Sequence, residues 1–202
     1  MEQKQNVLHK VTEMFMRYGI KSVTMDDISR NLGISKKTLY QYVDNKADLL
    51  QQVFQQHIED ETMAMESIVK ESKDAIDEIL NIAKYITNLL REMSPNTLYD
   101  LQKYYREVWD LMEELHQQHI YKVIHNNIER GVKEALYRAD IDTDIIARLY
   151  VSCNTVIVDE SVFPLKQYNT ERLFLEHIRY HIFGIASKKG LQLLDKYTKN
   201  KQ

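Results

Sequence analysis

The stretch TMDDISRNLGISKKTLYQYVDNK, residues 24–46, holds the start and stop signals of two short helices joined by a turn. Thr24 is a hydroxyl cap followed three residues later by Asp27, which resembles a capping box with Asp in place of Glu or Gln. Gly33 is suited to end this helix, and Ser35 to cap a second one that extends to about Tyr42. Helix, glycine-containing turn and helix within about twenty residues is the helix-turn-helix pattern.

The residues on both sides of this stretch also predict helices. A stripe of apolar residues at helical spacing precedes it and stops at Gly19: Val7, Leu8, Val11, Met14, Phe15 and Tyr18. Further helical patterns begin at Asp44-Asn45, near residue 74, at Pro95, at Asp142 or Thr143, at Thr170 and near the C-terminus. With only 5 Gly and 2 Pro, and with no alternating β pattern, the sequence predicts an all-α fold of long helices.

The composition excludes several other classes of protein. No run of about 18 apolar residues exists, so no membrane span is expected. The N-terminus MEQKQNVLHK lacks the apolar core of a signal peptide. Cys153 is the single cysteine, which excludes an internal disulfide and a multi-cysteine zinc site. We therefore expect a cytoplasmic protein without a cofactor.

The charge of the chain is unevenly spread. Residues 1–46 hold eight Lys and Arg against five Asp and Glu, a net charge of +3. Because the whole chain carries −3, the remainder carries −6. A basic end on an acidic body can meet a polyanion in one orientation.

The cations of residues 35–46 gather at a predicted helix start. Ser35 as a cap leaves Lys36, Lys37 and Thr38 in the first turn, where free backbone N–H groups favour a phosphate. Leu39 is the expected buried contact, so its neighbours face outward. Lysines pair with phosphates or guanine edges, and glutamine with adenine edges. DNA binding is one interpretation, and a solvated surface helix with two incidental lysines is the other.

From Val7 to about Val53, roughly a quarter of the chain, the sequence resembles the DNA-binding head of the tetracycline-repressor (TetR) family. The matching segments follow in order: FMRYG (15–19), TMDDIS (24–29), GIS (33–35), TLYQYV (38–43) and NKADLL (45–50). Ser29 stands where the family usually has Ala, Val43 where it has Phe, and Lys37 where Gly, Ala or Pro is common. The cation at Lys37 is the departure that bears most directly on DNA contact.

The resemblance implies an N-terminal three-helix helix-turn-helix DNA-binding head, residues 1–47, and a C-terminal helical bundle, residues 48–202, that binds an effector and dimerises. Thr24 and Met25 would lie beside the phosphate backbone, with Ser35 as the helix cap. The candidates for contact with base edges are Lys36, Lys37, Thr38 and Gln41. The candidates for clamping phosphates are Tyr40, Tyr42 and Lys46.

Two surfaces are expected in the body. Helices near the C-terminus would form a four-helix dimer interface through apolar and small residues: Ile145, Leu149, Cys153, Val156, Phe174, Ile178, Ile182, Gly184 and Ile185. An ordinary intramolecular core is the alternative for these residues. A pocket for an unknown effector, apolar or aromatic, would be lined by Met, Leu and aromatic side chains: Met63, Tyr85, Leu89, Met93, Tyr104, Tyr105, Trp109, Met112 and Tyr121.

Two histidine pairs have helical spacing, His116 with His119 and His177 with His181. Neither has a third ligand at a recognisable distance along the chain, so we expect no metal site. No Gly-rich phosphate loop, H-E-x-x-H or G-x-S-x-G motif is present, so we expect no enzyme.

The leading hypothesis is a homodimeric repressor that binds a palindromic operator in double-stranded DNA and is released by a small-molecule effector. An activator could use the same head. An all-helical protein-interaction module could keep the helix-turn-helix for packing alone. The outward face of residues 36–46 distinguishes a DNA-binding regulator from a protein-interaction module, because a cationic, hydroxylated face favours DNA and an apolar face favours a protein partner.

Overall fold

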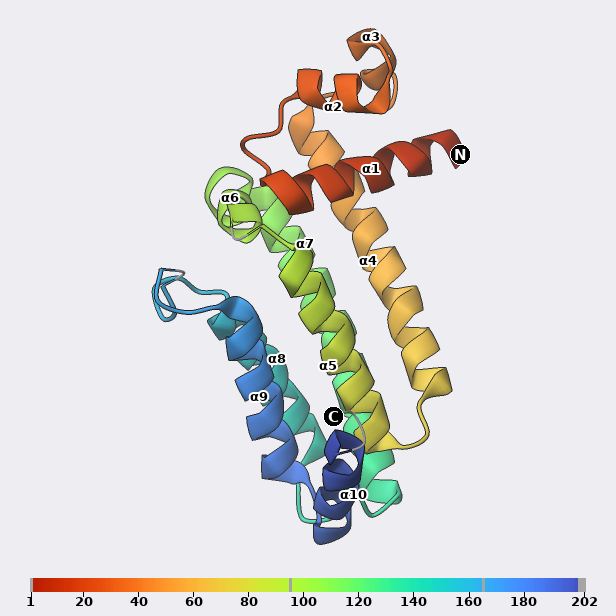
Figure 1. Ribbon diagram of the computed structural model, residues 1–202, viewed down its shortest axis with the longest axis vertical. Helices are drawn as coiled ribbons and strands as arrows, with labels where there is room; N and C mark the ends of the chain where they lie inside the picture. Colours follow the sequence, from red (N-terminus) through yellow and green to blue (C-terminus); the bar gives the residue numbers. More distant parts are fainter. Residues whose placement is uncertain (1, 95, 165, 200–202) are drawn as a thin grey trace. The chain divides into compact units, whose positions relative to one another are not determined.

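The computed structural model describes residues 2–94, 96–164 and 166–199. Within these ranges the chain forms ten α-helices and no β-strand beyond one isolated bridge between Tyr137 and Ala186. The helices are α1 (Glu2–Tyr18), α2 (Met25–Leu32), α3 (Lys36–Leu39), α4 (Lys46–Glu71), α5 (Ala75–Glu92), α6 (Asn96–Tyr104), α7 (Arg106–Lys133), α8 (Thr143–Ile157), α9 (Thr170–Ile185) and α10 (Lys188–Lys199) (Figure 1). The all-α prediction is confirmed. None of the described helices is long and apolar enough to span a membrane.

The chain contains two compact units. Unit 1 runs up to Met63 and resumes from Glu92 to His116, so it combines α1 to α3 and most of α4 with α6 and the start of α7. Unit 2 contains Ala64–Arg91 and the chain from Gln117 onward. The predicted boundary between the DNA-binding head, residues 1–47, and the body, residues 48–202, separates functions rather than compact units. It stays a prediction.

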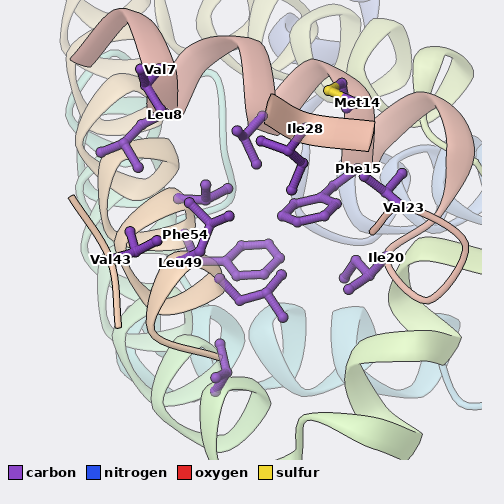
Figure 2. Packing of buried hydrophobic residues seen from close by; sticks show 14 of the residues in the cluster. Val7, Leu8, Met14, Phe15, Ile20, Val23, Ile28, Val43, Leu49 and Phe54 are labelled. Atoms are coloured by element: carbon purple, nitrogen blue, oxygen red, sulfur yellow. The ribbon is translucent and has the colours of Figure 1, made fainter. Parts of the chain in front are cut away.

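Unit 1 is built around one apolar cluster to which all its helices contribute. Phe15 of α1, Ile28 of α2, Leu39 of α3 and Leu49 of α4 are almost fully buried in it. Figure 2 shows Phe15 and Ile28 side by side, with Leu49 and Phe54 below them. Helices as short as α2 and α3 are unstable alone, so this shared burial is what maintains them.

The capping residues of the helix-turn-helix act as the sequence predicts. The Thr24 side chain accepts a hydrogen bond from the Asp27 N–H at 3.1 Å, and an Asp27 carboxylate oxygen accepts one from the Thr24 N–H at 3.0 Å. Gly33 adopts φ 66°, in the left-handed region that favours glycine. Asn45 accepts hydrogen bonds from the N–H groups of Ala47 and Asp48 and so caps α4.

The end of α3 and the cap of α9 differ from their predictions. The α-helical part of α3 ends at Leu39, and the N–H groups of Gln41 and Tyr42 donate to carbonyls three residues earlier, which tightens the last turn. The cap of α9 is Asn169 rather than Thr170. Pro95, predicted in a first helical turn, lies outside the described residues.

Within unit 1, α6 is attached to the end of α1 and to the loop that leads into α2. The Ser94 N–H donates to the Met16 carbonyl at 2.6 Å, and the Thr97 hydroxyl donates to the Phe15 carbonyl at 3.0 Å. In the loop, the Lys21 N–H donates to an Asp100 carboxylate oxygen at 2.7 Å. Residues some eighty positions apart along the chain therefore fix how the helix-turn-helix begins.

Unit 2 has its own apolar core and a buried polar network. Glu78, almost fully buried, accepts hydrogen bonds from Arg130 at 2.7 Å and from Asn127 at 3.0 Å. The Tyr137 hydroxyl donates to Asn127 at 2.9 Å. Because the buried carboxylate has a cationic partner and an amide donor, its desolvation is offset. The Tyr137 ring lies directly over Gly131 of α7.

This contact predicts opposite effects for two helical glycines. In Gly131→Ala, the added Cβ would stand 2.0 Å from the Tyr137 ring, so something must shift. We expect a loss of about 1–3 kcal/mol in the free energy of unfolding. Gly184→Ala is the matched control, because its Cβ meets nothing within 4 Å. It should gain up to about 1 kcal/mol from helix propensity. Denaturant unfolding of the two variants checks this, and equal effects would contradict it.

Candidate nucleic-acid interface

The outward face of residues 35–41 is cationic and hydroxylated. Ser35, Lys36, Lys37, Tyr40 and Gln41 are exposed, and Leu39 turns inward to the core. The Ser35 side chain accepts a hydrogen bond from the Thr38 N–H at 3.0 Å, and the two hydroxyl oxygens are 2.8 Å apart. Such a surface favours DNA over a protein partner.

The two adjacent lysines have different surroundings. Lys36 Nζ forms an ion pair with Asp26 of α2 at 2.9 Å, and the hydrogen bond and charge of Asp26 raise the pKa of Lys36. Lys37 has no ion pair with any described residue, and its side chain is exposed. Lys37 therefore presents the more available ammonium group, while Lys36 must exchange Asp26 for a phosphate or a base.

Three of the proposed DNA contacts also have roles in the fold. The Thr24 hydroxyl is 2.6 Å from a carboxylate oxygen of Asp27, within the capping box. Met25 and Tyr42 are half-buried and pack against the core of unit 1. Their proposed contacts to phosphate stay predictions. For Tyr42, packing of the ring and DNA contact by the hydroxyl are compatible.

Lys46 differs from its expected role. Its ammonium donates hydrogen bonds to the backbone carbonyls of Ile20 and Val23, and burial lowers the pKa of Lys46. The side chain also lies 5.8 Å from the centre of the Phe15 ring. The first residue of α4 thus holds the loop between α1 and α2, and two of its three N–H bonds are used internally. The geometry favours a positioning role over the predicted phosphate clamp.

A surface hollow of about 720 Å³ was not anticipated from the sequence. It lies between α1, the following loop and α2. Apolar, polar and charged side chains line it: Met14, Tyr18, Ser22, Val23, Asp27, Arg30 and Asn31. No pattern along the chain marks it, because the lining residues come together only when α1 and α2 pack.

The residues predicted to line an effector pocket divide between the units. Six belong to unit 1: Met63, Met93, Tyr104, Tyr105, Trp109 and Met112. Three belong to unit 2: Tyr85, Leu89 and Tyr121. The structure brings Tyr105, Trp109 and Met112 together against the core of unit 1, whereas Met63 and Tyr104 are exposed. The pocket as a set stays a prediction.

Two of these aromatic residues have polar partners that the sequence did not suggest. The Lys21 ammonium donates to the Tyr104 hydroxyl at 2.9 Å, which raises the pKa of Lys21. In unit 2, the Tyr121 hydroxyl donates to Asp144 at 2.5 Å. Each contact joins residues from different helices or loops, so spacing along the chain could not have revealed it.

The predicted dimer residues separate into an outward and an inward set. On α8, Ile145, Leu149 and Val156 are exposed, and Cys153 is half-buried. Gly184 of α9 is also exposed. The other predicted residues of α9 are buried in the core of unit 2: Phe174, Ile178, Ile182 and Ile185. These four face the core of their own subunit, which was the alternative given for them, and their dimer contact stays a prediction.

Different residues form the outward apolar face of α9. Leu175 and Phe183 are exposed, at 47% and 57%. They are two turns apart and lie between buried residues in the sequence, so the inward and outward faces of α9 are both apolar. Periodicity therefore could not tell them apart.

The histidine pairs do not form a metal cluster. Among the described residues, no group of three or more His, Cys, Asp or Glu could hold a metal ion. His116 Nε2 instead lies 3.1 Å from the buried carboxylate of Glu61.

Comparisons with known proteins agree with this architecture. Residues 7–53 match the family described as bacterial regulatory proteins, tetR family. An uncharacterized HTH-type transcriptional regulator, YvaF of Bacillus subtilis (strain 168), is 24% identical over 158 residues, which is 78% of this chain and 82% of the relative.

Solved structures with the same fold cover almost the whole chain. A TetR-family transcriptional regulator from Agrobacterium tumefaciens has a TM-score of 0.71 and 14% identity, over 92% of this chain and 99% of that one. The regulator FadR from Bacillus subtilis, in complex with stearoyl-CoA, has a TM-score of 0.62 and 17% identity, over 92% of this chain and all of that one. At such identities, the likeness establishes the fold.

The contacts of Lys46 predict that it acts on the loop rather than on a phosphate. Lys46→Met should weaken binding to every DNA sequence and lower the free energy of unfolding by about 1–2 kcal/mol, because two loop carbonyls lose a charged donor. The salt dependence of DNA binding should not change. A phosphate clamp would instead reduce the slope of log K against log salt by about 1.

Lys37→Met is the matched control for this test. Lys37 is exposed and has no ion pair among the described residues. The free energy of unfolding of the Lys37→Met variant should therefore stay within about 0.5 kcal/mol of that of the unmodified protein. If Lys46→Met leaves stability unchanged and lowers the salt slope, the positioning role is refuted.

Proposed function

Because the chain belongs to the TetR family of bacterial regulatory proteins and binds DNA as a transcriptional regulator, we propose that it is a homodimeric repressor released from a palindromic operator by a small molecule. The observation that carries the DNA-binding mode is the exposed turn at residues 35–41, with its cations, hydroxyls and amide. Such groups contact phosphates and base edges when a recognition helix enters the major groove.

The outward faces of α8 and α9 support dimerisation. Ile145, Leu149 and Val156 of α8 and Leu175 and Phe183 of α9 are large apolar side chains with 44–57% of their surface exposed. Exposed large apolar side chains gathered on two neighbouring helices favour a protein–protein interface. A second copy can cover it with the same surface in an isologous contact. Two recognition helices would then meet half-sites about 34–36 Å apart or a multiple of that distance.

The attachment of α6 to α1 supports control by a ligand. Ser94, Thr97 and Asp100 bond to the end of α1 and to the loop before α2. A displacement of α6 would therefore change where the helix-turn-helix starts. The structurally similar FadR is in complex with stearoyl-CoA, and we propose that this chain likewise binds a small effector.

Release requires a difference in affinity rather than binding alone. An effector lowers operator affinity only if it binds the DNA-free conformation more tightly than the DNA-bound one. A typical coupling of about 1–3 kcal/mol corresponds to a change of about 5–150-fold in operator affinity. An activator with the same head is the alternative, and transcription from an operator-linked promoter distinguishes the two.

The proposed DNA contacts predict different consequences for Lys37 and Gln41. Lys37→Ala should weaken binding to all DNA sequences and reduce the salt slope by about 1, because one phosphate contact is lost. Gln41→Ala should alter the preferred base pairs with little change in that slope. Fluorescence anisotropy across a salt series, with operator and random DNA, measures both.

Lys84→Ala provides the control for charge alone, because Lys84 is an exposed lysine of α5 in unit 2. Its salt slope should equal that of the unmodified protein. An unchanged slope for Lys37→Ala would contradict the proposed DNA face.

The outward apolar face predicts that one buried charge prevents dimerisation. Leu149 is 56% exposed, and a second copy would bury it. Leu149→Glu should shift the protein to a monomer in sedimentation velocity and weaken operator binding at least about tenfold, because an unpaired carboxylate in an apolar interface is costly. Leu111→Glu, an exposed leucine of α7, should remain a dimer. A monomeric unmodified protein, or a dimeric Leu149→Glu variant, would refute the interface.

A further inference from the structure

Helices α8 and α9 contain three buried polar atoms that have no hydrogen-bond partner among the residues that the structure describes. They are Oδ1 of Asn154 on α8 and Nε2 of His177 and of His181 on α9. Leaving a buried polar atom unpaired costs about 1–3 kcal/mol, so such atoms are rare in folded proteins. Three of them on one helix pair are therefore an unusual concentration.

The side chains around these atoms are packed against one aromatic ring. The Tyr150 ring centre is 4.6 Å from the His177 ring and 4.8 Å from the His181 ring. Asn154 lies four residues after Tyr150 on α8, so it shares the helix face of Tyr150. His177 and His181 are likewise four residues apart on α9. We call Tyr150, Asn154, His177 and His181 the polar seam.

Two members of the polar seam are buried, and the other two, Asn154 and His177, are half-buried. His181 is 7% exposed and Tyr150 3%. The helix face that carries His181 also carries Ile178 and Ile182 of the unit 2 core. The polar seam therefore lies on the inward side of the helix pair, away from the outward apolar face proposed for dimerisation.

Both imidazoles of the seam are neutral near pH 7. Burial lowers the pKa of His177. Burial and then the charge of His177 lower the pKa of His181 to about 4. His177 also forms a hydrogen bond with the backbone of Tyr150. Since an imidazole donates to a carbonyl through a ring N–H, the unpartnered Nε2 of His177 is left with its lone pair.

The available atoms are therefore mainly acceptors without a compensating charge. Asn154 Oδ1 and His177 Nε2 are acceptors, and His181 Nε2 can accept or donate. No ion pair among the described residues involves a member of the polar seam. A full charge on the ligand would be desolvated without a counter-ion, which is unfavourable. The described residues also offer no three-ligand metal cluster.

We propose that the polar seam binds an uncharged ligand that carries at least two O–H or N–H donors on an aromatic or apolar frame. The donors meet Asn154 Oδ1 and the histidine Nε2 atoms, and the frame packs on the Tyr150 ring. The inference rests on the proposed function in one respect: such a ligand is the chemical class of the effector. The effector would then contact α8 and α9 rather than the Met and aromatic residues predicted to line its pocket.

Four small aromatic probes test the donor requirement: 1,3-dihydroxybenzene, 1,3-dimethoxybenzene, benzoate and benzylammonium. The unmodified full-length protein is titrated with each, and the imidazole nitrogens are followed in ¹H–¹⁵N spectra. The dihydroxy probe should bind at least about tenfold more tightly than the others, since two net hydrogen bonds are worth about that factor. It should shift the Nε2 signals of His177 and His181. Equal affinity for the dimethoxy probe, or tighter binding of an ion, overturns the proposal.

Variants distinguish a ligand site from a structural role. His181→Leu and Asn154→Leu each remove an unpaired buried polar atom, so both should raise the melting temperature while reducing binding of the dihydroxy probe at least about tenfold. Asn88→Leu, at an exposed position of α5, is the matched control and should keep probe binding. If both seam variants lower the melting temperature, or if both bind the probe as before, the proposal is overturned.

Operator binding and probe binding are measured separately, so the two proposals fail separately. A protein that binds its operator but not the dihydroxy probe overturns the polar seam and leaves the proposed function standing. A protein that binds the probe but no DNA overturns the proposed function and leaves the polar seam standing.

Discussion

The backbone carbonyls at the end of α1 are the constraint on which the DNA-binding part of the structure depends. A helix leaves its last carbonyls without partners inside the helix. Here the Met16 carbonyl accepts from Ser94, just before α6, and the Phe15 carbonyl accepts from Thr97 of α6 in addition to the local N–H of Gly19. Lys46 supplies two more bonds, to the carbonyls of the following loop. The start of the helix-turn-helix is therefore held by segments that follow it far along the chain.

Fewer lysines of the proposed DNA-binding surface are available to bind DNA than the sequence suggests. Of the three lysines in residues 35–46, Lys36 has Asp26 as a partner and Lys46 has two carbonyls. Lys37 alone among them has neither an ion pair nor an internal hydrogen bond with a described residue. Lys37 therefore adds an available charge to the proposed DNA-binding surface.

The outward and inward faces of α8 and α9 carry different kinds of side chain. Their outward faces present Leu149 and Phe183, which a second subunit can cover. Their inward faces combine apolar residues such as Ile178 with the polar seam. A core made only of apolar residues would be more stable, because unpaired buried polar atoms cost free energy. Retaining them agrees with a binding role for this part of unit 2.

The sequence by itself determined the all-α class, the helix-turn-helix and its caps. Thr24 with Asp27, Gly33, Ser35 and Asn45 act within four residues of their own positions, so their roles can be read along the chain. Only the tertiary structure decided what Lys46 binds, which apolar face of α9 is buried, and where unpaired polar atoms collect. Each of these depends on a partner from a distant segment, and hydrophobic periodicity does not specify which of two apolar faces packs inward.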